Sequence, residues 1–151
     1  MPVILTSPDS WHVPVKILTF LASSFAWRPH SRTLSDGASE PPPQRVGDAV
    51  VVFFQAEQDD EDPDRRKRAL RHALKHIKWL ANKRGYRNIV LHSFGHLGSS
   101  KASSEFARAF QDEVAERLGS TYEVACTPFG WSCSWDLSVE GDTLAKVWKE
   151  I

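Results

Sequence analysis

Apolar runs separated by turn-forming residues predict strands and helices that alternate along most of this chain. The run at 49–54 contains only alanine, valine and phenylalanine, as expected of a strand buried on both faces. Between 134 and 139, Trp135, Leu137 and Val139 alternate with polar residues, which predicts a half-exposed strand. Further strands are predicted at 3–5, at 13–26 (as a strand or a hairpin), at 89–91 and at 122–126.

Two stretches repeat apolar residues at helical spacing and carry capping residues at their ends. The first begins after Asp62, an N-cap residue followed by a proline, and ends at Gly85. The second begins after Ser103 or Ser104 and ends at Gly119. A closing helix is predicted from the spacing of Leu144, Val147, Trp148 and Ile151.

A long loop is predicted at about 28–48, because prolines and glycines lie there among serine and threonine. A chain of 151 residues can form one domain that buries roughly 70% of the surface of its unfolded form. We therefore predict a single α/β domain over 1–151, with strands interrupted by two long helices and a short closing helix.

The composition, 41% hydrophobic and 25% charged, is that of an ordinary soluble globular protein. The apolar stretch at 17–26 is too short to span a bilayer, and the residues before it do not form a signal peptide. The two cysteines, Cys126 and Cys133, give no disulfide framework and fit a reducing compartment. A cytoplasmic protein without a membrane partner is the expectation.

Net charge is zero, so bulk charge does not indicate a nucleic-acid partner, but the charges are unevenly distributed. An acidic run at 59–62 is followed directly by the basic run 65–68, and more Lys and Arg residues follow up to Arg87. Two interpretations remain open. The cations form the solvated face of a helix, or they contact phosphates in a salt-sensitive manner.

Two turns carry a resemblance to a known family. Phe94-Gly95-His96-Leu97 resembles an aromatic-Ala-His-Leu turn, and Phe129-Gly130-Trp131 resembles the start of a Phe-Gly-Trp-Tyr-Lys turn. Both belong to the N-terminal editing domain of archaeal-type threonyl-tRNA synthetases, which is related to the D-aminoacyl-tRNA deacylases. The strand that ends at Ala56-Glu57 and the segments 3–9 and 141–145 resemble the same family in the same order.

The resemblance implies a single domain with the deacylase-like fold and its mixed sheet. It also implies trans-acting hydrolysis of a mischarged aminoacyl-tRNA, either seryl-tRNA(Thr) or a D-aminoacyl-tRNA, by a homodimer that binds the tRNA 3′ end as an aminoacyl-adenosine. No cofactor is implied. Substrate-binding residues are expected at Ala56, Glu57, Phe94, Gly95, Leu97, Phe129, Gly130, Trp131 and Ser132.

The chain departs from the family where the family has ionisable side chains. Ser132-Cys133 replaces the Tyr-Lys pair, and Lys146 stands where the family has a Glu. We hypothesise that the cation has moved to Lys146 on the predicted closing helix. The expected catalytic residues are therefore His96, Cys133 and Lys146.

Three alternatives remain open. Cys133 is a candidate nucleophile activated by His96, although a free cysteine is more often a buried apolar residue. The pairs His72/His76 and His92/His96 are four residues apart, which permits a metal site, but neither lies in an H-E-x-x-H motif and no metal is expected. Loss of the ionisable set also fits a non-catalytic module that binds tRNA or a nucleotide.

Overall fold

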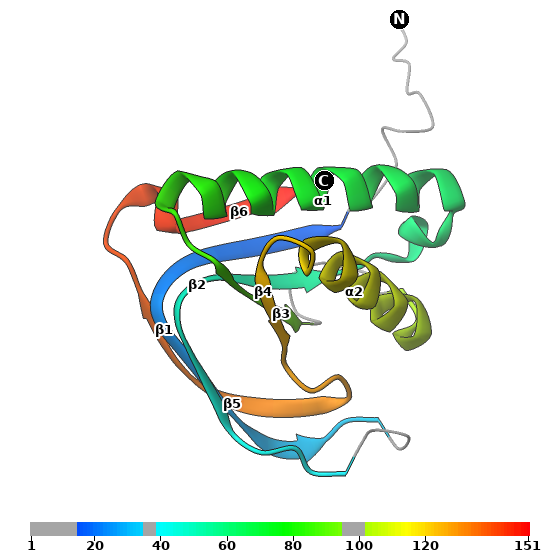
Figure 1. Ribbon diagram of the computed structural model, residues 1–151. Coiled ribbons are helices and arrows are strands. Elements are labelled where there is room, and N and C mark those ends of the chain that lie inside the picture. Colours follow the sequence, from blue (N-terminus) through cyan, green and yellow to red (C-terminus); the bar gives the residue numbers. More distant parts are fainter. Residues whose placement is uncertain (1–14, 35–38, 95–101) are drawn as a thin grey trace, which may run out of the picture.

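One six-stranded mixed sheet organises the fold, and two long helices pack on one of its faces (Figure 1). The computed structural model describes residues 15–34, 39–94 and 102–151. The strands are β1 (Lys16–Arg32), β2 (Gln44–Gln55), β3 (Asn88–Ser93), β4 (Glu123–Cys126), β5 (Trp131–Val139) and β6 (Lys146–Glu150). The helices are α1 (Pro63–Arg84) and α2 (Ser104–Leu118), with short 3₁₀ turns η2 (Gln58–Glu61) and η3 (Thr143–Ala145).

The strand order is β4-β3-β2-β1-β5, and β6 also pairs with β1. Strands β2, β3 and β4 are parallel, and the connections between them contain α1 and α2. Parallel neighbours need such crossover helices, whereas β1 can pair directly with β2, β5 and β6 because these pairs are antiparallel. The carboxyl ends of the three parallel strands therefore meet at one edge of the sheet.

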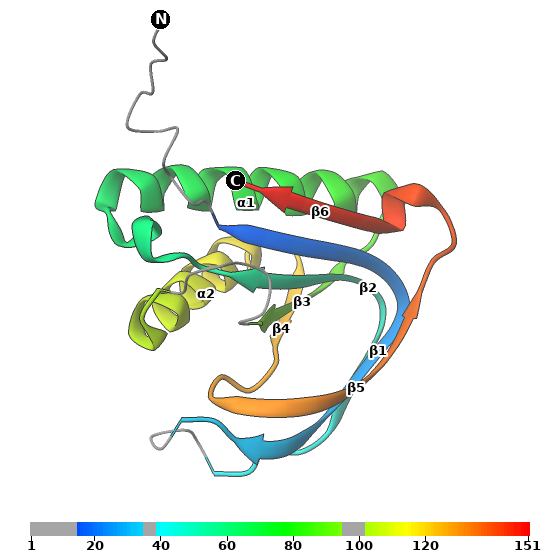
Figure 2. The same cartoon turned by 180° about the vertical axis from the view of Figure 1, so that it is seen from behind.

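The sheet curls so strongly that its two ends face one another across an inner surface (Figure 2). The long strand β1 makes this possible, because its first part pairs with β6 and its later part with β5, with register shifts at Ala22/Ser24 and Pro29/Ser31. The ring centroids of His92 on β3 and Trp135 on β5 lie 5.2 Å apart although β2 and β1 separate these strands in the sheet. The inner surface is therefore a half-closed space.

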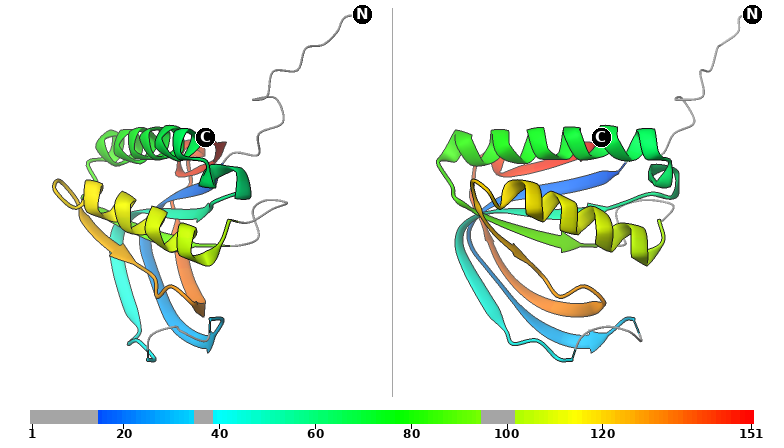
Figure 3. Two further views of the ribbon diagram at one scale, coloured as in Figure 1. Left: turned by 90° about the vertical axis from the view of Figure 1, so that its right-hand side faces the viewer. Right: turned by 45° about the vertical axis from the view of Figure 1, so that its right-hand side comes forward.

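Both helices are capped as predicted. The Asp62 carboxylate accepts a bond from the backbone N–H of Arg65 (3.2 Å), and Gly85 ends α1 in the left-handed region with φ 67°. The Ser103 hydroxyl accepts from the N–H of Phe106 (3.2 Å) at the start of α2. Figure 3 shows the two helices on the same side of the sheet.

Hydrophobic residues form one core on each face of the sheet. Between the helices and the sheet lie residues such as Ile17, Val52, Ile77 and Phe110. The smaller cluster on the inner face contains Ala22, Phe25, Trp27, Ala49, Val51, Phe53 and Val90. The run at 49–54 contributes to both clusters and is buried throughout, so the predicted two-sided burial of this strand is confirmed.

Two predicted elements differ from the structure. The closing helix is the 3₁₀ turn η3 followed by strand β6, because the first part of β1 offers an open edge whose backbone groups β6 can pair. The predicted loop at 28–48 is shorter, because 28–32 continue β1 and 44–48 begin β2. Of the two alternatives for 13–26, the strand is confirmed, because the described part of this region lies in β1, and the predicted strand at 3–5 lies outside the described residues.

Candidate active site

A pocket of about 420 Å³ opens on the inner face, where β2, β3 and β4 end and β5 begins. Residues from α2 and from the segment after β1 complete its wall. Among the described lining residues there is no Asp, Glu, Lys or Arg. The predicted site residues that line it are Ala56, Phe94, Phe129, Gly130, Trp131, Ser132 and Cys133.

The turn before β5 is tied to the segment that follows β1. The Gly130 carbonyl accepts bonds from the backbone N–H groups of Thr33 (2.7 Å) and Leu34 (3.2 Å). Gly130 has φ 85°, a conformation that a residue with a side chain adopts only with strain. The glycine therefore allows the turn to bring its neighbours Phe129 and Trp131 into the pocket wall.

Two arginines stack on the aromatic residues of this turn. The Arg108 guanidinium lies 4.9 Å from the ring centroid of Phe129, and the Arg32 guanidinium lies 5.4 Å from that of Trp131. Such pairs hold an aromatic ring in place and keep the positive charge close to it. The pocket is thus neutral inside, with cations stacked on two of its wall residues.

His92 lines the pocket, although it is not among the site residues predicted from the sequence. Its Nδ1 lies 2.7 Å from the Thr127 hydroxyl, and its ring packs 4.8 Å from the Phe53 ring. Burial lowers the pKa of His92 to about 4, so the ring is neutral near pH 7. Because Thr127 donates to the Leu91 carbonyl (3.5 Å), we assign the ring proton to Nδ1, which leaves Nε2 as an acceptor.

Cys133 lines the pocket and packs against the inner hydrophobic cluster. Burial raises the pKa of its thiol, so the thiol form predominates near neutral pH. This environment does not favour the thiolate that a cysteine nucleophile requires. His96, its expected activator, lies outside the described residues with Gly95 and Leu97.

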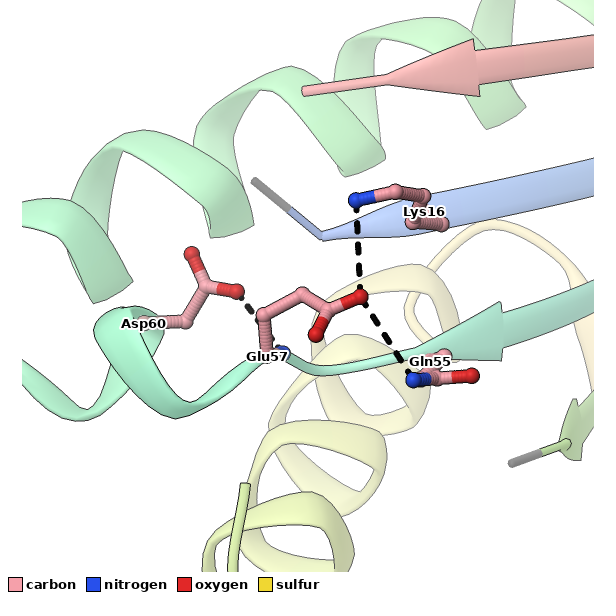
Figure 4. Close-up of polar contacts among 4 residues, drawn as sticks. All are labelled: Lys16, Gln55, Glu57 and Asp60. Atoms are coloured by element: carbon pink, nitrogen blue, oxygen red, sulfur yellow. Dashed lines mark hydrogen bonds and ion pairs between the residues drawn. The ribbon is translucent and has the colours of Figure 1, made fainter. Parts of the chain in front are cut away.

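Glu57 does not line the pocket, because its side chain is fully buried beside it. Figure 4 shows its carboxylate joined to Lys16 and to Gln55. Its Oε1 lies 3.4 Å from the Lys16 ammonium and accepts a bond from the Gln55 amide (3.5 Å). The backbone N–H of Glu57 donates to the Asp60 carboxylate (2.9 Å). Gln55 does line the pocket, so the buried ion pair adjoins the site through this residue.

The structure does not bring Lys146 to the pocket. This residue begins β6 opposite Phe20, is exposed, and donates to the Gly141 carbonyl (3.4 Å). It is absent from the residues that line the pocket. The hypothesis that Lys146 brings a cation to the site from a closing helix is therefore wrong, because this segment is a strand and Lys146 does not line the pocket.

The two histidines paired on α1 differ in their surroundings. His76 is buried against Thr19 (3.3 Å from Nε2 to the hydroxyl), whereas His72 lies at the helix surface. No cluster of three or more metal-ligating side chains occurs in the described part of the chain. Within the same part, no helix is both long and apolar enough to cross a membrane.

Residues 15–151 match the family model described as the archaea-specific editing domain of threonyl-tRNA synthetase. The chain belongs to this family. The match begins just before β1, so the segment 3–9, expected from the sequence to resemble the family's opening strand and turn, lies outside both the matched and the described residues.

Several archaeal threonine--tRNA ligases are similar to this member of the family. Identity to the ligase of Methanococcus maripaludis (strain C7) is 30% over 108 residues, which is 71% of this chain and 17% of the ligase. Identity to that of Methanosphaera stadtmanae is 32% over 107 residues, or 70% of this chain and 17% of the ligase. The chain thus spans about a fifth or less of these relatives.

The fold agrees with that of a solved structure described as a probable eukaryotic D-amino acid tRNA deacylase. The TM-score is 0.65, and the likeness covers 91% of this chain and 99% of the solved one. Identity is 13%, so this comparison establishes the fold alone. The predicted α/β fold, a single deacylase-like domain with a mixed sheet and two helices, is confirmed.

Proposed function

We propose that this editing-domain protein hydrolyses the ester bond of mischarged aminoacyl-tRNA in trans, with seryl-tRNA(Thr) or a D-aminoacyl-tRNA as substrate. One observation carries the proposal. The described residues of the two turns that resemble the editing family, Phe94 and 129–131, lie in the wall of one pocket although they are far apart in the sequence. Membership of the editing-domain family supports it.

The size and lining of the pocket suit the end of an aminoacylated tRNA. A volume of about 420 Å³ is within the ordinary range of small-molecule sites. Phe94, Phe129 and Trp131 offer rings on which an adenine can stack, and Ala56 leaves room at the end of β2. We propose that Gly95, His96, Leu97 and Ser132 contact the same aminoacyl-adenosine.

Hydrolysis at this site needs little from side chains, because an aminoacyl ester is already activated. Water adds to the carbonyl carbon, and the negative charge that develops on the carbonyl oxygen would be stabilised by backbone N–H groups of the two turns. The bond from carbon to the ribose oxygen then breaks, and that oxygen takes a proton. The neighbouring ribose hydroxyl of the substrate is proposed to assist this transfer.

His92 and Gln55 supply neutral polar groups to this scheme. With Nδ1 of His92 bonded to Thr127, its Nε2 can accept a hydrogen bond from the attacking water or from a ribose hydroxyl. A pKa of about 4 makes this ring a weak base, so we propose a positioning role for it instead of proton abstraction.

A panel of esters tests the proposal. The protein is incubated with seryl-tRNA(Thr), several D-aminoacyl-tRNAs and the matched L-forms, and the loss of the ester is followed over time. Selective loss of the mischarged forms is the expected result. Hydrolysis of none of them would contradict the proposed activity.

A second function has one specific observation in its favour, the lack of ionisable Asp, Glu, Lys and Arg side chains among the described lining residues. This lining fits a module that binds the tRNA 3′ end, or a nucleotide, without chemistry. Retained binding of uncharged tRNA with no hydrolysis of any ester would support this alternative.

We also propose a cytoplasmic protein, from its composition, and a homodimer, from the family resemblance. Sedimentation at several protein concentrations measures the oligomeric state directly. A mass that stays at 17.0 kDa at all of them would contradict the dimer.

A further inference from the structure

Helix α1 carries a strong excess of positive charge in a chain whose net charge is zero. Asp64 in its first turn is the one acidic residue of the helix, and Lys or Arg residues occupy every other charged position. The acidic residues that balance the total lie elsewhere, including the 59–62 segment just before the helix. Charge is therefore segregated between parts of the molecule.

Four of these cations form a continuous line along the exposed side of α1. Arg68, Arg71, Lys75 and Lys78 follow one another at spacings of three and four residues, and all four are exposed. We call these four residues the basic stripe. At a rise of about 1.5 Å per residue the stripe is about 15 Å long, enough to face several phosphates of a duplex.

Ion pairs distinguish the stripe from other cations of α1. Other cations of α1 do form ion pairs, Arg66 with Glu113 and Arg84 with Asp142. In the part of the chain that the structure describes, no stripe residue forms such a pair. Charges that repel one another along a helix face reduce stability, so their accumulation favours an external anionic partner.

A second element adds to this positive surface. Lys149 on β6 is exposed, and its charge acts on His72 together with those of Arg71, Arg68 and Lys75. Partial burial is the largest cause of the lowered pKa of His72, and these four cations lower it further. The positive potential therefore converges from α1 and β6 on one side of the molecule.

An exposed aromatic residue lies beside the stripe. The Trp79 side chain is 50% exposed, and the Lys83 ammonium lies 5.9 Å from its ring centroid. A flat ring among cations matches the bases and riboses of RNA, which stack on aromatic surfaces.

We propose that the basic stripe, extended by Lys149, binds the phosphate backbone of the tRNA body while the 3′ end occupies the pocket. The inference rests on the proposed function, which identifies tRNA as the RNA concerned. Of the two interpretations of the basic run given by the sequence, it favours contact with phosphates and names the residues that make this contact. Affinity would come from the stripe, and ester selection from the pocket on the inner face.

Salt dependence of tRNA binding tests the inference. The triple variant Arg68→Gln, Arg71→Gln, Lys75→Gln removes three positive charges. Glutamine is a good helix former, so α1 should stay folded. Binding of uncharged tRNA is measured between about 50 and 200 mM salt. We expect weaker binding and a plot of log K against log salt whose slope is smaller by about 2 to 3, since each phosphate contact contributes about 0.7 to 0.9.

The matched control is Arg28→Gln, Arg117→Gln, Lys146→Gln, which removes the same charge from exposed positions away from α1. Its slope is expected to stay close to that of the unmodified protein. Equal slopes for the two triple variants would overturn the inference. Circular dichroism and the urea midpoint of both variants show that a changed slope does not come from unfolding.

A minimal ester separates this inference from the proposed function. Aminoacyl-adenosine lacks the tRNA body, so the stripe variant is expected to hydrolyse it at the unmodified rate while its KM for aminoacyl-tRNA rises. A rate on the minimal ester that falls as much as the rate on tRNA would overturn the inference. If the unmodified protein hydrolyses no ester, the proposed activity fails, and the difference in salt slope still decides the role of the stripe.

Discussion

Cys133 occupies the position where the resemblance implies a catalytic lysine, and its surroundings favour a thiol. Burial raises its pKa, and its side chain packs against the inner hydrophobic cluster. We therefore expect Cys133→Ala to retain the single-turnover rate of deacylation. A rate lower by several orders of magnitude, with an acyl-enzyme trapped on the unmodified protein, would instead identify Cys133 as the nucleophile.

The buried pair of Lys16 and Glu57 makes a prediction about stability. Either Lys16→Met or Glu57→Leu removes one charge of this buried pair and keeps the other, and breaking a buried pair in this way typically costs about 3 kcal/mol or more of unfolding free energy. The double variant removes both charges, so it should be more stable than the sum of the single losses predicts. Urea unfolding of the three variants measures this, and strictly additive losses would contradict the pairing.

His92 makes stability depend on pH. Its pKa is about 4 in the folded protein, against 6.5 for a histidine in an unfolded chain, so between these values the unfolded chain binds a proton that the folded one does not. Stability is therefore complete above about pH 6.5 and falls toward pH 4, by about 2 kcal/mol at pH 5 for this group. Buried His76, whose pKa is also lowered to about 4, acts in the same direction.

Urea midpoints near pH 7.5 and pH 5 check this dependence. His92→Gln keeps a polar partner for Thr127 but does not titrate, so this variant should lose less stability on acidification. His30→Gln on an exposed part of β1 is the control. An equal loss in His92→Gln and the unmodified protein would show that His92 is protonated in the fold.

Single residues of the site were only partly predictable from the sequence. The two family turns located the pocket wall, and seven of the predicted residues line it. Gln55, His92 and Thr127 were missed because each stands at or just after the end of a predicted strand, where periodicity does not show which face meets a ligand. Spacing along the strand could have found two of them. Gln55 lies two residues after Phe53 and His92 two residues after Val90, and residues two apart in a strand point to the same face, here the inner one.

At the scale of elements, the end of α1 depends on one glycine. Gly85 has φ 67° and donates to the carbonyls of the preceding turn, with open space where a side chain would lie. Gly85→Ala should therefore cost about 1 kcal/mol through backbone strain alone. Gly141→Ala also meets no neighbouring atom and is not in the left-handed region, so it serves as the control. Equal urea midpoints for the two variants would contradict this assignment.

The helices were predictable because both carry their caps and a repeated apolar face over several turns. Strands β1 and β6 were not. Pro29 lies within β1 at a register shift, where a missing N–H is tolerated, so local composition suggested a loop. Segment 146–150 is a strand because it pairs with the open edge of β1. The sequence of these five residues does not indicate that such an edge is present.

At the scale of the whole molecule, the curvature of the sheet brings the two family turns together in one pocket. β5 folds over the ends of β2 and β3, and Trp135 contacts Phe53, His92 and Phe94 with ring centroids 4.8 to 5.6 Å apart. The pocket therefore lies between distant parts of one sheet, with the basic stripe on a different element. This separation would allow the proposed tRNA binding and the proposed ester selection to be altered independently.

Single-turnover deacylation by a pocket-filling variant tests the central claim most directly. Ala107 lines the pocket from α2, whereas Ala109 on the same helix does not line it and is exposed. The unmodified protein and Ala109→Phe should accelerate loss of the ester from seryl-tRNA(Thr) or a D-aminoacyl-tRNA, and Ala107→Phe should not. An Ala107→Phe variant that is as fast as the unmodified protein, or no acceleration by any of the three, would contradict an editing site in this pocket.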